Sequence, residues 1–369
     1  MHRSFASATT LLLACAVGLV PALACGDLVI PNNSDDGGSS SSGDDSSGDD
    51  VSVDARPPPD CDAGVEPVAL ACTGLYTNWT QLTLAPDVQA FTPGATLWYD
   101  GADSSRWIWL PPGSKIDTTD LNDWVFPVGT KIWQELRLLG KRIETRYLWK
   151  EAPGLWFRTT FAWTADQSAA PALTVGQPNA RGLPYDIPPV SQCGQCHDGA
   201  ADSVLGFELV SLAMPRSSGL NLQALVGKGL LTKKPAATPI VPGGDVNTIN
   251  ALMFLHANCG TSCHNRGPSA EGGATGLFLK LTVDGNGALP SSPQLTDTWT
   301  TSVNVPSTFT PYGPDAGGFW RIHPGDVAHS SVAWMTARRD GVTQMPPIAT
   351  HLVDENDVQL LDAWISAIR

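Results

Sequence analysis

The sequence of 369 residues predicts a multidomain α+β protein, in which an all-β, sandwich-like N-terminal domain precedes a mainly helical region. Two observations lead to this prediction. Between residues 73 and 190, short aromatic and β-branched runs are separated by Gly and Pro, which is typical of strands joined by turns. Beyond residue 243, apolar side chains recur every three or four positions, which indicates helices with one buried face.

Residues 1–24 have the pattern of a signal peptide. Arg3 precedes an apolar run over residues 11–20, and small residues lead to a cleavage point after Ala24. The run is too short for a convincing membrane span. The next residue, Cys25, indicates a second interpretation, a bacterial lipoprotein attached to the membrane through a lipidated Cys25. Both interpretations predict export, and we favour a lipoprotein in the periplasm or at the outer membrane or cell surface.

Residues 25–72 predict a disordered tether, because their Ser, Gly and Asp cannot bury enough apolar surface to fold. Nine aspartates between residues 35 and 62, against Arg56 alone, supply about −8 of the net charge of −14. The remainder is only mildly acidic. This charge argues against nucleic acid as a partner, since nucleic acid requires a basic surface. It suits a basic redox partner and equally an ordinary solvated surface.

The eight cysteines fall into four groups. Cys15 belongs to the signal peptide, and Cys25 is the candidate lipid site. Cys61 and Cys72 are close in sequence, so we expect a disulfide between them in an oxidising compartment. The remaining four belong to two motifs that combine cysteine with histidine.

The predicted β domain spans residues 73–190. Its predicted strands cover residues 95–99, 106–110, 131–138, 142–150 and 155–163. Nine of the thirteen tryptophans fall here, and we expect them to fill the core rather than to form a carbohydrate-binding platform. The domain contains no His or Cys and therefore offers no obvious transition-metal site.

The first motif, Cys193-Gly194-Gln195-Cys196-His197, has the C-x-x-C-H pattern that attaches a c-type haem. Cysteines one helical turn apart form two thioethers, and the adjacent histidine binds iron as the proximal ligand. Prolines upstream argue against a helix leading into the motif. Short helices are expected over residues 203–212 and 220–226. This first unit, residues 191–242, is too short to hold the framing helices of a complete cytochrome domain.

The second motif, Cys259-Gly260-Thr261-Ser262-Cys263-His264, has three residues between its cysteines instead of two. We expect the extra residue to bulge so that both thioethers reach the vinyl groups. Residues 243–369 around it predict a class I cytochrome c-like domain. A helix over 246–256 leads into the motif, another is expected over 326–338, and a helix capped by Asp354 closes the chain.

Methionine is a common sixth ligand of electron-transfer haems. Met345, which follows a flexible stretch and precedes two prolines, is the candidate for the second haem. Met214 is the nearest methionine to the first motif, although an open position or a ligand from elsewhere are alternatives. The other candidates are His256, His323, His329 and His351. Met253 and Met335 are expected in the core. Candidate partners for haem propionates are Arg321, Arg338 and Arg339.

A structural zinc site is the alternative to haem. It would be assembled from the four motif cysteines, Cys193, Cys196, Cys259 and Cys263. This alternative leaves His197 and His264 without a role, so we favour haem.

With these residues assembled, the chain resembles a family of bacterial exported dihaem c-type cytochromes over residues 76–369. The matching stretches are residues 110–116, 126–130, 142–146, 193–197, 205–206, 258–264, 324–326, 330, 345–347 and 363–365. The resemblance implies two covalently bound haem c groups, with His197 and His264 as proximal ligands and Met345 as a distal ligand. The extra residue in the second motif departs from the family pattern. The resemblance implies no reaction.

Three functions follow from these expectations. The leading one is electron transfer in the cell envelope between the two haems and a redox partner protein. A second is catalysis, with a peroxidase-like reduction of a small molecule at a first haem whose sixth position is open. In the third, the haems accept electrons from a dehydrogenase or from a substrate bound by the β domain.

Overall fold

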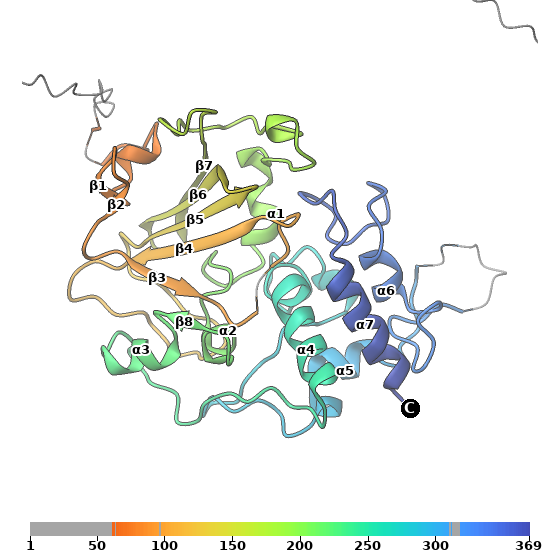
Figure 1. Cartoon of the computed structure of the whole chain (residues 1–369). Helices are drawn as coiled ribbons and strands as arrows, with labels where there is room; N and C mark the ends of the chain where they lie inside the picture. The colour runs from red at the N-terminus through yellow and green to blue at the C-terminus, as the bar shows by residue number, and fades with distance from the viewer. Residues whose placement is uncertain (1–60, 63, 96, 310, 312–317) are drawn as a thin grey trace, which may run out of the picture. The chain divides into compact units, whose positions relative to one another are not determined.

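An antiparallel six-stranded sheet organises the N-terminal half of the computed structural model (Figure 1). The strands lie in the order β7 (Leu155–Ala162), β6 (Lys141–Ala152), β5 (Lys131–Leu138), β4 (Asp103–Trp109), β3 (Gln89–Thr92) and β8 (Ser218–Gly219). The structure describes residues 61–369 except 63, 96, 310 and 312–317. The predicted signal peptide, Cys25 and most of the predicted tether therefore lie outside the described residues.

Four of the five predicted strands are confirmed, as β4 to β7. The fifth, residues 95–99, is wrong, because the described part of this segment is not a strand. Instead, β3 pairs with β4. The short strand β8, which lies within the predicted first haem unit, pairs with β3 and becomes an edge of the sheet. Residues 191–242 are thus continuous with the β domain.

The predicted sandwich is not formed. The only other sheet in the described part of the chain has two short strands, β1 (Tyr76–Asn78) and β2 (Thr83–Leu84). One face of the large sheet is covered by N-terminal residues such as Leu70 and Leu75, which pack with its aromatic side chains. The other face packs against residues that follow the sheet in the chain. The fold is therefore a mixed α+β arrangement.

Side chains alternate between these two faces. Trp107, Trp133 and Tyr147 are buried in the aromatic cluster of the first face, which confirms that tryptophans fill the core there. On the opposite face, Ile108, Ile132 and Leu148 form a row of paired neighbours across β4, β5 and β6. This row contributes to a second hydrophobic cluster with side chains from later helices.

Seven α-helices occur in the described residues: α1 (Cys193–His197), α2 (Leu209–Ala213), α3 (Leu222–Gly227), α4 (Val246–Leu255), α5 (Asp297–Ser302), α6 (Ser331–Thr336) and α7 (Glu355–Ala367). The predicted helices before the second motif and at the chain end are confirmed as α4 and α7. The carboxylate of Asp354 caps α7 by accepting from the backbone amides of Asn356 and Asp357. The helix expected over 326–338 is shorter than predicted and appears as α6.

The helices α4 and α7 pack together around a separate core. Leu255 from α4 and Leu361, Trp364 and Ile365 from α7 are buried in this cluster. In contrast, Leu252 and Met253 on another side of α4 join the cluster beneath the sheet. One helix thus contributes to both cores. Within the described part of the chain, no helix combines the length and apolar character needed to cross a bilayer.

The expected disulfide between Cys61 and Cys72 is present. It ties the start of the described chain to the short turn that places Leu70 against the sheet. The four remaining described cysteines are free thiols: Cys193, Cys196, Cys259 and Cys263.

Candidate functional site

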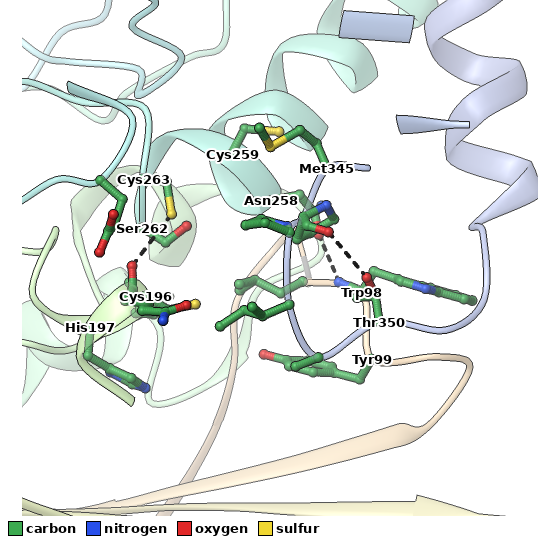
Figure 2. Close-up of a pocket in the computed structure, with 18 of the residues that line it drawn as sticks. Trp98, Tyr99, Cys196, His197, Asn258, Cys259, Ser262, Cys263, Met345 and Thr350 are labelled. Atoms are coloured by element: carbon green, nitrogen blue, oxygen red, sulfur yellow. Dashed lines mark hydrogen bonds between the residues drawn. The ribbon is translucent and has the colours of Figure 1, made fainter. Parts of the chain in front are cut away.

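A cavity of about 420 Å³ lies between the sheet and the helical part (Figure 2). Its volume falls in the range of roughly 300–1,000 Å³ that is usual for pockets binding small molecules and cofactors. Both sequence motifs line it, although 62 residues separate Cys196 from Cys259 in the chain. The cysteine and histidine residues at its wall are Cys193, Cys196, His197, Cys259, Cys263 and His264.

The first motif forms the whole of α1. A single 3₁₀ turn, Val190–Gln192, leads into it, and no longer helix precedes the motif in the described residues 180–192. Because α1 begins at Cys193, the two thiols of the motif lie about one helical turn apart. His197 ends the helix and faces the same cavity.

The imidazole of His197 is held in one tautomer. Its Nδ1 lies 2.6 Å from the backbone carbonyl oxygen of Ser203, so Nδ1 must carry the proton and donate. The Nε2 atom is therefore a lone-pair donor. Burial lowers the pKa of His197 to about 4, which also favours the neutral ring. A histidine that ligates a metal typically has this hydrogen bond at its other ring nitrogen.

The backbone at Ser203 is held in place by the hydrogen bonds of the preceding residue, Asp202. Ser203 adopts a left-handed conformation, with φ 63°. The buried carboxylate of Asp202 accepts hydrogen bonds from Lys150 Nζ at 2.6 Å and from Trp156 Nε1 at 2.9 Å. It also accepts from the backbone amide of Phe126 at 2.7 Å. Side chains from β6 and β7 thus hold Asp202, and with it the adjacent carbonyl of Ser203 that accepts the hydrogen bond from His197.

The second motif absorbs its extra residue in a π-helical turn. This turn, His256–Gly260, continues directly from α4. The backbone amide of His264 donates to the carbonyl of Cys259 at 2.8 Å, a span of five residues. The π-turn accommodates one additional residue at this point of the chain, and π-turns inside helices are frequent at functional sites.

His264 sits in a tight setting that depends on Gly272. A Cβ atom added to Gly272 would lie 2.6 Å from Nδ1 of His264, closer than van der Waals contact allows. Burial lowers the pKa of His264, so the neutral imidazole is favoured here too. Gly272 was not singled out in the sequence, since only the close approach of the folded chain gives it a role.

The two motifs are in direct contact. The thiol of Cys263 donates to the backbone oxygen of Gln195 at 3.7 Å. A hydrogen bond from Cys196 lowers the pKa of Cys263, and the same bond raises that of Cys196. Close to these thiols, a side chain at Gly199 would overlap the carbonyl oxygen of Ser262. The two motifs are therefore neighbours that line one shared cavity.

Met345 lines the cavity and extends toward Cys259 (Figure 2). Met335 on α6, which was expected in the core, also lines the cavity, and its carbonyl accepts from the amide of Met345 at 3.1 Å. Met214 is buried in the hydrophobic cluster beneath the sheet and does not reach the cavity. Met214 therefore lies apart from the residues of the two motifs that line the cavity. Met253 is in the core, as expected.

The other candidate ligands are held elsewhere. Both ring nitrogens of buried His256 are engaged, Nδ1 by the amide of Leu281 and Nε2 by Glu208. His323 and His329 share the carboxylate of Asp326, and His351 pairs with Asp186. Among the described residues, only His197 and His264 bring imidazoles to the cavity wall.

A hydrogen-bonded junction holds the Met345 loop against the β domain. The amide of Trp98 donates to Asn258 Oδ1 at 2.8 Å (Figure 2). The indole of Trp98 donates to the carbonyl of Leu352 at 2.8 Å. The buried carboxylate of Asp100 accepts from the amides of His351 and Leu352 at 2.9 Å. Trp98, within the segment 95–99 that was predicted as a strand, and the nearby Asp100 therefore connect the sheet to the loop that carries Met345.

Five arginines line the cavity: Arg106, Arg146, Arg158, Arg321 and Arg339. Arg321 and Arg339 were expected as partners for propionates, whereas Arg338 stacks on Trp334 outside the cavity wall. The three arginines of the sheet were missed. They come from different strands, so the sequence places no two of them together. The alternation of residues 142–149 was the one available signal that Arg146 shares a face with Glu144.

Among the residues that the structure describes, no group of three or more His, Cys, Asp or Glu side chains is placed to hold a metal ion. The four-cysteine zinc site considered above is accordingly not assembled here. What the cavity offers is a mixed wall of thiols, imidazoles, thioethers and guanidinium groups around apolar side chains. No known protein family, no curated protein and no solved structure matches this chain.

Proposed function

We propose that this protein is an exported dihaem c-type cytochrome that transfers electrons in the bacterial cell envelope. The observation that carries the proposal is the convergence of both motifs on one cavity, with His197 fixed in the tautomer of a metal ligand by Ser203. A core histidine would need no particular nitrogen left unprotonated toward a cavity.

The wall suits a haem group in each of its chemical parts. In this proposal the thiols of Cys193, Cys196, Cys259 and Cys263 would form thioethers, and His197 and His264 would be the proximal ligands. All six residues line the cavity, which supports these roles. Met345 is the proposed sixth ligand at the second site. The haem iron supplies reversible one-electron chemistry, and a thioether ligand raises its reduction potential. The residues of the chain would hold and orient the haem and exclude water from it.

Contact between the two motifs favours electron transfer over two independent functions. Because Cys263 touches the backbone of Gln195, groups attached to the two motifs would be neighbours. A redox partner protein, export through the signal peptide and attachment through lipidated Cys25 complete the proposal. These parts rest on the sequence alone.

One observation keeps a catalytic function as a second candidate. Met214, the nearest methionine to the first motif, is buried away from the cavity. The backbones of Met335 and Met345 are hydrogen-bonded to each other, and Met345 extends toward Cys259 of the second motif (Figure 2). The first site therefore has a proximal ligand without an assigned sixth ligand, as a peroxidase-like reduction of a small molecule requires.

Haem counting in cysteine variants tests the proposal. The full chain would be produced with the c-type maturation machinery and analysed by pyridine haemochrome spectra and by haem staining after denaturing electrophoresis. We expect two covalent haems per chain, and one in each of the variants Cys193→Ser/Cys196→Ser and Cys259→Ser/Cys263→Ser. Protein without covalent haem would overturn the proposal.

Spectra of the ferric protein with peroxide or cyanide, and of the reduced protein with carbon monoxide, separate the two candidates. Two low-spin haems that do not respond to peroxide, cyanide or carbon monoxide support electron transfer alone. A high-spin signal that responds to these ligands, and that disappears in the Cys193→Ser/Cys196→Ser variant, supports catalysis at the first site.

A further inference from the structure

Arg106 is a buried cation without a carboxylate partner in the described part of the chain. Only 6% of its surface is exposed, and none of the ion pairs among the described residues includes it. Its Nη2 donates to the hydroxyl of Tyr99 at 3.0 Å, and its guanidinium also lies over that ring. Arginine is rarely buried unless a negative charge compensates it. Arg106 lines the cavity, so the missing charge belongs there.

Cross-strand pairing places Arg106 in a polar row on the cavity face of the sheet. Arg106 on β4 pairs with Gln134 on β5, which pairs with Arg146 on β6, which pairs with Thr160 on β7. Directly opposed residues in a sheet have neighbouring side chains on the same face. All four residues line the cavity.

The charges in this row and at Arg158, which also lines the cavity, do not balance. Arg146 is neutralised by buried Glu144, whose Oε1 accepts from its Nη2 at 2.8 Å, while Thr160 donates to Oε2. Arg158 is neutralised by Asp198 at 2.6 Å. Three guanidinium groups thus face two carboxylates. The surplus of one positive charge lies in a setting where an uncompensated ion is costly.

We propose that Arg106, with Gln134 and Arg146 beside it, binds a carboxylate or another small oxyanion inside the cavity. The planar guanidinium presents paired donors that match an oxyanion, and such bonds are about twice as strong as neutral ones. The anion is either a propionate of a haem held by the first motif or a dissolved monoanion. The first source rests on the proposed function, and the second does not.

The test compares Arg106→Gln, which removes the charge, with Arg106→Lys, which keeps it. Arg266→Gln is the matched control, because Arg266 pairs with Asp297 on the exposed surface and does not line the cavity. Thermal unfolding establishes that each variant folds. If Arg106→Gln fails to fold, Arg106→Lys is compared with the unaltered protein instead, because it keeps the positive charge and removes the paired donors of the guanidinium.

In haem-loaded protein, the source is resolved by redox titration and by calorimetry with sodium formate. A propionate at Arg106 predicts that Arg106→Gln lowers the midpoint potential of one haem, while formate binds neither protein. A dissolved anion predicts that formate binds the unaltered protein and that Arg106→Gln weakens this binding about tenfold or more. Unchanged potentials together with equal or absent formate binding in both proteins overturn the proposal.

Failure of the site and failure of the proposed function give different results. If the chain carries no haem, formate binding to haem-free protein that is lost in Arg106→Gln keeps the oxyanion site and removes the cytochrome function. If the chain carries two haems but Arg106→Gln behaves as Arg266→Gln does throughout, the cytochrome function stands and the oxyanion site falls.

Discussion

The Nδ1 atom of His197 lies 2.6 Å from the carbonyl oxygen of Ser203, a residue held in the left-handed backbone region. The carbonyl can point at the imidazole because the backbone turns at this position. A β-branched side chain is strained at such a φ value, whereas glycine is not.

The pair Ser203→Val and Ser203→Gly therefore separates backbone geometry from side-chain loss. Both variants remove the hydroxyl that accepts from Arg158. We expect Ser203→Val to cost about 1–3 kcal/mol of stability and to shift the potential of the first haem. Ser203→Gly should retain the potential of the parent protein. Urea unfolding and redox titration measure the two effects, and equal potentials in both variants would contradict the role of the carbonyl.

Removing Asp202 should be among the most destabilising single changes. Its carboxylate lies 2.6 Å from Lys150 Nζ, and both side chains are buried. In Asp202→Ala the ammonium remains buried without a counter-charge, and we expect a loss of about 3–5 kcal/mol in the free energy of unfolding. The double variant Lys150→Met/Asp202→Leu should recover much of that loss. A single variant within 1 kcal/mol of the parent protein, on the order of a surface substitution, would show that the pair is unimportant.

Met345 and Met335 form a natural comparison, because both line the cavity. We expect Met345→Leu to lower the potential of one haem and to convert that haem to high spin, since a thioether ligand is lost. Met335→Leu conserves volume and should leave the spin state unchanged. Ferric absorption spectra and redox titration distinguish the two. The reverse pattern would assign the ligand role to Met335.

The start of α7 should be sensitive to pH. Burial and neighbouring Asp354 raise the pKa of Asp357 to about 7. The unfolded chain loses this proton at lower pH than the folded protein, so the stability contributed by the protonated carboxyl is lost as pH rises from about 4 to about 7 and stays lost at higher pH. We expect Asp357→Asn to be roughly 0.5 kcal/mol more stable than the parent protein at pH 8 and equal to it near pH 3.

Melting temperatures at the two pH values provide the measurement. Glu355→Gln is the control, because Glu355 is exposed in the same first turn. That substitution removes a carboxylate near the positive end of the helix and should not stabilise it. A gain for Asp357→Asn that is equal at both pH values would contradict the proposed repulsion.

Local sequence patterns predicted those parts of the fold that depend on neighbouring residues. Short aromatic and β-branched runs between Gly and Pro located β5, β6 and β7 closely, and the capping carboxylate of Asp354 located the start of α7. The strand predicted over residues 95–99 was wrong, because the backbone amide and the indole of Trp98 donate to Asn258 and Leu352 and do not take part in a sheet. No local signal distinguishes these roles.

Of the candidate site, too, the sequence revealed only the parts whose residues are close together in the chain. The two motifs were recognisable because cysteine and histidine lie within a few positions of each other. Arg106 and Arg146 were not, since they are neighbours only through the register of three strands. The sandwich prediction failed for a related reason: the apolar face of the sheet is covered by residues 204–231 and parts of α4, not by a second sheet.

The cavity wall extends along the chain from Phe91 to Asp354. Such a wall is complete only when nearly all of the described chain has folded. An occupant that binds the folded state alone therefore adds its binding free energy to the stability of sheet and helices together. We expect the wall of the cavity to be completed late in folding. A chain without a bound group should unfold at a lower temperature, and should do so along its whole described length.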